Sequence, residues 1–348
     1  MSHGRCAIEV SLEQGLRAQL DKLPHGLRPK LPRDERIVII DNPQASGGRY
    51  ALHGARAQQF YRLLGYDCEI STTQAPGDAV HLARQAAEGG ATLAIACGGD
   101  GAVREVAMGL MQVPESVRPK FSVVPKGTVN VFARTMGLQV GPVPDFFHSC
   151  LKQIFWARTT RIDVARIAGD PFVCFAGFGY DATVIENVPP NEKRLFREWA
   201  FVSSAFRTLF GWGAPSSRLE PYEPVELRVR AATPSGDVDV RGWLAAIGNV
   251  KDYGPGWFPF HPLARVDDGL LDVLVVTTQD KIEMMRIGAQ VLGRSHLRNP
   301  YVQYFQSPGP IRVDSLGAPV PSHADCELVG RTAGAVITLE PGALTVVF

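Results

Sequence analysis

The stretch that most constrains the fold is residues 93–101, which read Leu-Ala-Ile-Ala-Cys-Gly-Gly-Asp-Gly. Its first five residues are small or apolar and uncharged, which is typical of a strand buried in a parallel sheet. Residues 102–111 place apolar side chains at helical spacing, so we expect a helix directly after the glycines. A strand, a glycine turn and a helix N-terminus suit an anion such as phosphate, because free N–H groups and the positive end of the helix dipole meet there.

Asp100 stands in this turn, where an anion should be unfavourable. Its carboxylate fits if it shares a cation with phosphates or accepts a hydrogen bond from a ribose or a water. The glycine spacing matches neither the dinucleotide-binding fingerprint nor the P-loop. Taken alone, the turn is also compatible with an ordinary strand end.

Two further strand–loop–helix units have similar loops. Residues 36–40 predict a buried strand before Asn42-Pro43-Gln44-Ala45-Ser46-Gly47, and residues 121–124 predict another before Pro125-Lys126-Gly127-Thr128-Val129-Asn130. In an open parallel sheet such loops gather beyond the carboxyl ends of the strands, where ligands bind. Arg49 and Lys126 are candidates to touch phosphate, although solvated surface cations are an equal reading of both.

The remaining pattern separates two domains. Before the glycine turn we expect a strand over residues 66–73 and a helix over residues 79–87 with Asp78 as its N-cap. After residue 158, short β-rich runs predict an antiparallel sandwich with helical insertions near 191–210 and 280–293. The expected strands are 161–167, 172–176, 225–231, 238–247, 270–277, 311–313, 335–339 and 344–348.

Length and composition limit the function classes. The chain has 348 residues, enough for two domains, and its net charge of +1 argues against a dedicated nucleic-acid binder. The six cysteines form no Cys-x-x-Cys pair, so we expect reduced thiols. No run of about 18 apolar residues is present, and no secretory signal is recognised, so we expect a cytoplasmic protein.

Several separated motifs agree with one family. They are Asn42-Pro43 with Ser46-Gly47, Gly98-Gly99-Asp100-Gly101 with Glu105, Pro125 with Gly127-Thr128 and Asn130, Gly177-x-Gly179-x-Asp181, Gly248-Asn249, Asp268-Gly269-Leu270 with Asp272, and Asp325 with Glu327. In this order the chain resembles the diacylglycerol kinase catalytic-domain family, which includes bacterial lipid kinases and sphingosine and ceramide kinases. The resemblance covers residues 36–348.

The resemblance implies a domain plan. Residues 36–158 would be an α/β nucleotide domain like that of NAD kinases and phosphofructokinases, and residues 159–348 a β-rich acceptor domain. Residues 1–35 lie before the resemblance, and from their own pattern we expect an extension with a short polar helix and then a linker. A cleft between the two domains would hold ATP and Mg²⁺.

The resemblance also implies roles for individual residues. Glu327 would be the general base, with Asp325 beside it and Asp100 as a further catalytic carboxylate. Asp268 and the main-chain carbonyls of Arg265 and Leu270 would hold Mg²⁺, with Asp100 and Asp181 in the surrounding network. The residues implied for ATP are Asn42, Pro43, Ser46, Gly47, Thr73, Gly98, Gly99, Asp100, Gly101, Ala102, Glu105, Gly127, Thr128 and Asn130.

Three departures keep a second reading open. Ala102 stands where the family has threonine, the first loop is one residue longer than usual, and Cys326 replaces the glycine of Asp-Gly-Glu. If that backbone needs a positive φ, cysteine costs about 1 kcal/mol or more. A nucleotide- or lipid-binding protein without turnover therefore remains an alternative, as does a soluble-metabolite kinase of the NAD kinase type.

The acceptor is expected to be a lipid at a membrane surface, diacylglycerol first and ceramide or sphingosine next. Residues 192–212 combine an aromatic helical stripe containing Trp199 and Phe206 with a net charge of +2. This pattern indicates either a helix packed on the β-domain or a cover for lipid at the inner face of the membrane. Tyr253 and the run 257–260 are expected to line the acceptor site, and homodimer formation is left open.

Overall fold

The structure is a computed structural model that describes residues 13–24, 26–141, 143–188, 204–205, 207–210, 223–253 and 258–348. The chain divides into two compact units. Unit 1 comprises Met1–Gly127, Met136–Thr160 and Thr345–Phe348, and unit 2 comprises Thr128–Thr135 and Arg161–Leu344. Each unit is described by itself.

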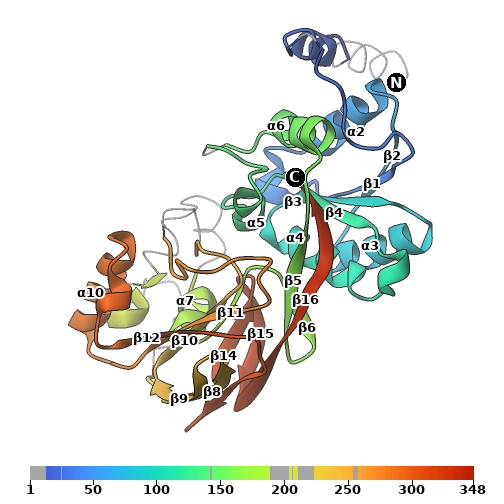
Figure 1. The fold of residues 1–348 in the computed structure, drawn as a ribbon. Coiled ribbons are helices and arrows are strands. Elements are labelled where there is room, and N and C mark those ends of the chain that lie inside the picture. Colours follow the sequence, from blue (N-terminus) through green and yellow to red (C-terminus); the bar gives the residue numbers. More distant parts are fainter. Residues whose placement is uncertain are drawn as a thin grey trace. The chain divides into compact units, whose positions relative to one another are not determined.

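Unit 1 is a parallel sheet with helices on both faces (Figure 1). The strand order is β2-β1-β3-β4, and the end of β16 adds a further parallel neighbour through Val346 and Phe121. Its main elements are β1 (Arg36–Asp41), α2 (His53–Leu63), β2 (Asp67–Thr72), α3 (Asp78–Glu88), β3 (Leu93–Gly98), α4 (Asp100–Leu110), β4 (Lys120–Pro125) and α6 (Phe146–Leu151). Unit 1 also has short 3-10 turns at Ala45–Gly48 and Glu115–Val117, a π-helical turn at Lys152–Trp156 and a helix over residues 13–20.

Successive side chains of a strand point to opposite faces of the sheet, and in unit 1 helices cover both faces. In β1, Ile37 and Ile39 join a core with Phe60 of α2 and Cys150 of α6. The central strand β3 is buried along its whole length, as a doubly covered strand must be. The expected helix after the glycine turn is α4, whose Val103, Val106, Ala107 and Leu110 are buried.

One expectation for unit 1 was wrong. Asp78 does not cap α3, because Gly77 is the N-cap residue and the Asp78 carboxylate accepts the preceding N–H groups of Gln74 (2.7 Å) and Ala75 (2.8 Å). The described part of the stretch before residue 36 packs on unit 1. Leu31 is buried in the core of unit 1, and its carbonyl accepts a hydrogen bond from the Tyr66 hydroxyl.

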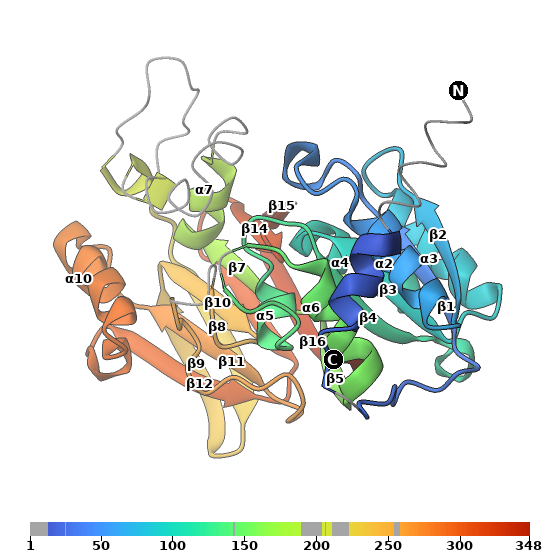
Figure 2. The same cartoon turned by 90° about the horizontal axis from the view of Figure 1, so that it is seen from above.

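Unit 2 is an antiparallel β-sandwich, seen from a second direction in Figure 2. Its strands are β5 (Thr159–Ile167), β6 (Asp170–Phe172), β7 (Phe175–Gly179), β8 (Leu227–Thr233), β9 (Gly236–Gly242), β10 (Leu244–Gly248), β11 (Leu271–Val276), β12 (Val302–Ser307), β13 (Ile311–Ser315), β14 (Val320–Ala324), β15 (Glu327–Thr332) and β16 (Gly334–Val347). Its helices are α5 (Val131–Thr135), α7 (Tyr180–Glu186) and α10 (Lys281–Leu292), with a 3-10 turn at His296–Arg298.

One sheet of the sandwich has the order β12-β11-β10-β7-β14-β15, and the facing strands run β16-β13-β8-β9 with β5 and β6 beside β16. Inward side chains such as Phe178 of β7, Val273 of β11 and Val229 of β8 form one shared core. The alternate residues of the six-stranded sheet therefore face away from that core, and α10 covers part of that outer face.

The sequence pattern located most strands of unit 2 but not their breaks. The expected strand 238–247 is two strands in different sheets, β9 and β10. The runs 335–339 and 344–348 are one strand, β16. Strands β12, β14 and β15 were not predicted, because they are rich in polar residues. The insertion near 280–293 is confirmed as α10, whereas most of 191–210 lies outside the described residues.

Candidate active site

The predicted phosphate-binding loops of unit 1 lie at one edge of its sheet. The strand register pairs Asp41 with Thr72 and with Cys97, and Gly98 with Pro125. All four parallel strands therefore end level with one another, and the loops beginning at Asn42, Thr73, Gly99 and Lys126 follow side by side. This is the edge at which open α/β sheets bind ligands.

Two close approaches explain glycines of these loops. A Cβ at Gly99 would lie 3.0 Å from the Cα of Gly127, so the second and third loops come close to each other there. A Cβ at Gly98 would lie 2.4 Å from the Ala102 methyl group. Ala102 is buried against this glycine, so its methyl group packs at the base of the loop while its main-chain N–H stays in the first turn of α4.

Lys126 joins all three loops. Its ammonium is completely buried and pairs with Asp41 at 2.7 Å, its N–H donates to the carbonyl of Gly98 at 2.8 Å, and its carbonyl accepts from the Ser46 hydroxyl at 2.7 Å. Neither reading of Lys126 holds: the ammonium is not a solvated surface cation, because it is fully buried, and its charge is balanced by Asp41 instead of being offered to phosphate. Sequence reasoning missed the partner because Asp41 is 85 residues away.

The other residues implied for ATP are divided between the two units. Thr73 donates its N–H to the carbonyl of Asp41 at 2.9 Å, and Glu105 accepts the N–H of Gly77 at 3.1 Å. Gly47 is exposed, as is the neighbouring cation Arg49, which remains a candidate. Thr128 and Asn130 belong to unit 2, where Asn130 is buried with a positive φ of 54°.

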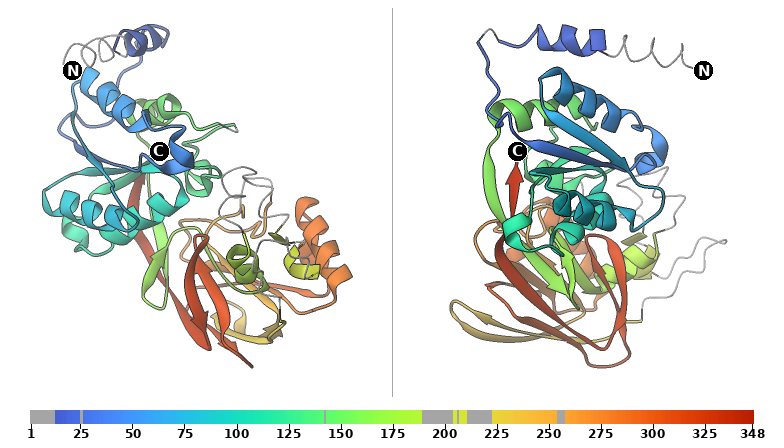
Figure 3. Two further views of the ribbon diagram at one scale, coloured as in Figure 1. Left: turned by 180° about the vertical axis from the view of Figure 1, so that it is seen from behind. Right: turned by 90° about the vertical axis from the view of Figure 1, so that its right-hand side faces the viewer.

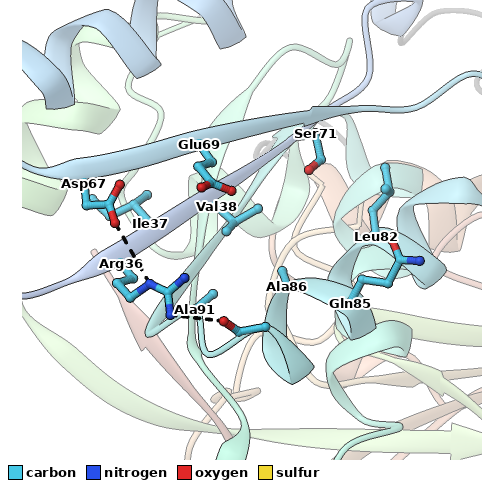
Figure 4. A pocket seen from close by; sticks show the side chains of 11 residues that line it. Arg36, Ile37, Val38, Asp67, Glu69, Ser71, Leu82, Gln85, Ala86 and Ala91 are labelled. Carbon is cyan, nitrogen blue, oxygen red and sulfur yellow. Dashed lines mark hydrogen bonds and ion pairs between the residues drawn. The ribbon is translucent and has the colours of Figure 1, made fainter.

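A separate hollow lies elsewhere on unit 1 (Figure 4). Its volume is about 170 Å³, and its polar lining includes Arg36, Asp67, Glu69 and Gln85. Arg36 donates to the carbonyl of Gly89 at 3.1 Å and lies 3.9 Å from Asp67. Arg36 and Asp67 begin their strands, so this hollow extends from the opposite end of the sheet and does not involve the predicted loops.

In unit 2, two of the expected catalytic residues, Asp325 and Glu327, lie at a tight hairpin between β14 and β15. Ala324 pairs with Glu327, and the two residues between them have positive φ values, 49° for Asp325 and 64° for Cys326. Two-residue hairpins favour Asn-Gly or Asp-Gly because both positions need positive φ. Cys326 therefore stands in the glycine position of this turn, and Glu327 is exposed immediately after it.

Asp325 is an anchor for neighbouring main chain. It is buried, and its carboxylate accepts N–H groups from Val173 (3.0 Å), Cys174 (2.9 Å) and Phe175 (3.0 Å). Its own N–H donates to the carbonyl of Phe175 at 2.8 Å. These bonds occupy both carboxylate oxygens, so the geometry supports positioning of the hairpin better than the catalytic role expected for Asp325.

Asp181 belongs to a polar cluster that the sequence did not reveal. Its Oδ2 accepts from the Tyr253 hydroxyl at 2.7 Å and lies 2.8 Å from Nε2 of the fully buried His323. Burial and the Asp181 carboxylate raise the pKa of Tyr253, so its hydroxyl keeps its proton and donates it. A Cβ at Gly177 would lie 1.8 Å from Asp181 Oδ2, which explains that glycine of the motif.

A second buried carboxylate shapes the predicted metal loop. Asp163 accepts the N–H groups of Gly269 and Gly342, each at 2.7 Å, and donates its own N–H to the carbonyl of Val266. Asp268 accepts the N–H of Leu270 at 3.1 Å. Desolvation is the main cause that raises the pKa of Asp268, with nearby Asp163 adding to it.

Two further buried side chains, Asp272 and His261, lie on the outer face of the six-stranded sheet. Asp272 lies beside Gly248 and accepts from the Tyr304 hydroxyl, and burial raises its pKa to about 6. The ring of His261 covers Gly248, where a Cβ would lie 2.2 Å from Nδ1. Burial lowers the pKa of His261 to about 4, so this ring is neutral near pH 7.

The expected acceptor segments are only partly described. The stripe with Trp199 and Phe206 and the residue Trp257 lie outside the described residues. Tyr253 stacks on Phe175 with ring centroids 4.0 Å apart, and Phe258 stacks on Phe260 at 5.8 Å. These rings therefore pack on the outer face of the six-stranded sheet, which leaves the lining of an acceptor site as a prediction.

Comparison with known proteins agrees with both units. The family model for the diacylglycerol kinase catalytic domain matches residues 36–167, and the model for the YegS C-terminal NAD kinase beta sandwich-like domain matches residues 175–348. A crystal structure of a diacylglycerol kinase from Bacillus anthracis superposes with a TM-score of 0.69 at 22% identity, covering 91% of this chain and 98% of that chain. That likeness supports the fold.

Similar sequences include a probable lipid kinase YegS-like protein from Chromohalobacter salexigens, 32% identical over 71% of this chain and 74% of the relative. A diacylglycerol kinase from Bacillus subtilis is 28% identical over 78% and 84% of the two chains.

The structure has a parallel α/β unit, with loops at the carboxyl edge of its sheet, and an antiparallel sandwich. Together with the matching family model, this fold places the chain in the class of kinases expected from the motifs. Within that class, the chain belongs to the diacylglycerol kinase catalytic-domain family and carries the YegS-type C-terminal domain.

Proposed function

We propose that the protein is an ATP-dependent lipid kinase that transfers the γ-phosphoryl group of ATP to a lipid hydroxyl. Diacylglycerol is the first candidate acceptor, and ceramide- or sphingosine-like lipids come next. The observation that carries the proposal is the alignment of strand ends in unit 1. The carboxyl ends of β1, β3 and β4 are in register, so the loops that follow these strands lie at the same edge of the sheet. Family membership supports the kinase chemistry and ATP as donor.

Phosphoryl transfer needs positioning and charge neutralisation more than covalent help. The first turn of α4 offers main-chain N–H groups and the positive end of a helix dipole to the phosphates. Asp100, in the same turn, would bind a cation or its water rather than phosphate. Lys126 would act through the protein, by keeping the three loops in register.

The donor set proposed for Mg²⁺ consists of oxygen atoms. Asp268 and the main-chain carbonyls of Arg265 and Leu270 suit a hard cation that keeps several waters. Among the described residues no group of three metal-ligating side chains exists, so carbonyls and water would complete the shell. When bound, Mg²⁺ would neutralise phosphate charge, and the Asp163 bonds to Gly269 and Gly342 would keep the loop in shape.

Glu327 is proposed as the general base that takes the proton of the lipid hydroxyl. It is exposed on the hairpin, and its main chain is fixed by the Ala324 pairing and by the anchored Asp325. The proposal assigns proton transfer to Glu327 and positioning to Asp325.

A test would use radiolabelled ATP, Mg²⁺ and vesicles that contain diacylglycerol, ceramide or sphingosine. We expect one lipid to be phosphorylated, with Asp100→Ala lowering kcat by about 10³-fold and Glu327→Gln by about 10²-fold or more. Circular dichroism of both variants would control for folding. Wild-type rates in both variants would contradict the assigned roles.

The NAD kinase-like description of the C-terminal domain favours a second candidate, phosphorylation of a soluble metabolite. An NAD arm in the same assay separates the candidates: phosphorylated NAD without phosphorylated lipid would replace the proposal. Nucleotide binding without any phosphorylated product would instead support the binding protein suggested by Ala102 and Cys326.

A further inference from the structure

Helix α10 has two apolar faces. Met284, Ile287 and Val291 are buried against the outer face of the six-stranded sheet. A helix turns about 100° per residue, so Ile282, Met285, Ala289 and Leu292 lie on the opposite side. Ile282 is 72% exposed and Leu292 is 50% exposed, so this second apolar stripe has no cover from the described residues. Figure 3 shows α10 at the periphery of its unit.

The residues that follow extend the apolar surface. Leu297 and Tyr301 are also exposed, at 36% and 45%. The segment 278–301 thus supplies four of the large exposed apolar side chains found in the described chain. A tyrosine beside aliphatic side chains is typical of surfaces that meet the boundary between water and lipid.

The same surface is basic. Residues 278–301 contain four cations, Lys281, Arg286, Arg294 and Arg298, against two carboxylates, Asp280 and Glu283. The net charge of the segment is therefore +2, whereas that of the whole chain is +1. This excess attracts an anionic partner.

Internal bonds leave the positive charge unbalanced. Asp280 accepts the N–H of Glu283 at 2.8 Å, and Glu283 accepts from Asn299 and pairs with Arg286 at 3.6 Å. Arg294 and Arg298 are exposed and form no ion pair within the described part of the chain. Two guanidinium groups are therefore available beside the apolar stripe.

We propose that this α10 surface, defined by Ile282, Leu292, Leu297, Tyr301, Arg294 and Arg298, docks the protein on an anionic lipid bilayer. An apolar stripe flanked by arginines matches acyl chains below negative headgroups. A protein partner would explain the apolar stripe, but the unpaired arginines favour a dense negative surface. No described helix has the length and apolar character needed to cross a bilayer, so attachment would be at the surface. The inference rests on the proposed lipid acceptor.

The test is co-sedimentation of the full chain with vesicles of phosphatidylcholine alone or with phosphatidylglycerol added. We expect binding only to the anionic vesicles. Ile282→Ser with Leu292→Ser, and separately Arg294→Gln with Arg298→Gln, should each weaken binding about 10-fold or more. These side chains are exposed, so folding should persist.

Matched controls distinguish binding through this surface from nonspecific binding of the protein to vesicles. Val140→Ser with Val143→Ser removes exposed apolar side chains from unit 1, and Arg228→Gln with Arg241→Gln removes arginines elsewhere on unit 2. Both control pairs should bind vesicles like the wild type. Equal losses in controls and α10 variants would overturn the inference, and so would dimerisation that the α10 variants abolish while vesicle binding is unchanged.

The experiment distinguishes failure of docking from failure of the lipid kinase function. Sedimentation needs no turnover, so absence of lipid phosphorylation with intact anionic binding would reject only the function. In the kinase assay, the α10 variants should lose activity on vesicles but keep it on a short-chain, monomeric diacylglycerol. Unchanged vesicle activity together with unchanged sedimentation would reject the docking surface.

Discussion

The two groups of site residues are held in different ways. In unit 1 the loops are placed mainly by main chain: parallel strands end level, and Gly99 approaches Gly127 closely. In unit 2 the loops are held by buried carboxylates, because Asp325 and Asp163 each accept hydrogen bonds from main-chain N–H groups of distant segments. The first arrangement follows from local sequence, whereas the second depends on long-range pairs.

The largest expected effect tests the buried ion pair of Lys126 with Asp41 in unit 1. Lys126→Met would leave the Asp41 carboxylate buried without its partner, which we expect to lower the free energy of unfolding by about 3–5 kcal/mol. Urea denaturation measures this change. If main chain alone held the loops, the loss would be below about 1 kcal/mol.

Two controls belong with this measurement. Arg84→Met breaks an exposed ion pair with Glu88 in the same unit and should cost less than about 1 kcal/mol. The double variant Asp41→Asn with Lys126→Met removes both charges and should recover part of the loss.

The next effect concerns the neutral histidine on the outer sheet face of unit 2. The pKa of His261 is about 4 when folded and about 6.5 when unfolded, so the unfolded chain binds the proton more tightly. Stability from this ring is complete above pH 6.5 and is lost as the pH falls toward 4. The wild type should lose about 3 kcal/mol more than His261→Gln between pH 7 and pH 4.

Glutamine at this position keeps a donor for the carbonyl of Ala246 without a titrating group. The measurement is the free energy of unfolding at several pH values. Parallel pH profiles for the two proteins would mean that the ring is not desolvated.

A third effect decides the role of Asp325. Asp325→Asn weakens three charge-assisted bonds to main chain, so we expect unfolding to become easier by about 2 kcal/mol and kcat to fall as well. A general base would instead lose kcat without loss of stability. Asp239→Asn, at an exposed pair with Arg228, is the control and should change stability by less than about 1 kcal/mol.

These differences show what the sequence could and could not predict. The parallel sheet, α4 behind the glycine turn and the gathering of three loops follow from local patterns, because strand, glycine and helix signals are close in sequence. The antiparallel sandwich was also predicted from its strand runs. The ion pair of Asp41 with Lys126 could not be, since its members are 85 residues apart and each has a plausible solvated role.

The same reason applies to unit 2. His323 stands in a strand whose polar residues gave no strand signal, and its partners Asp181 and Tyr253 are 142 and 70 residues away. Asp325 was recognised by motif, but its anchoring role depends on main chain near Val173, which no local pattern indicates. The motifs therefore identified the functional residues, whereas the contacts of these residues with distant parts of the chain could not be predicted.

The smallest effect compares two hairpin turns in unit 2. The turn Ala168-Gly169 between β5 and β6 has positive φ at both positions, 51° and 93°, and so does Asp325-Cys326. Glycine fills the second position in one turn and cysteine in the other.

Because a side chain in the left-handed region costs about 1 kcal/mol, Cys326→Gly should stabilise the protein by about that amount. Gly169→Cys, where a Cβ meets open space, should destabilise it by a similar amount. Thermal unfolding measures both changes. If Cys326→Gly destabilises the chain while Gly169→Cys behaves as expected, the Cys326 side chain makes packing contacts that exceed its backbone strain, and the departure from Asp-Gly-Glu stabilises the hairpin that presents Glu327.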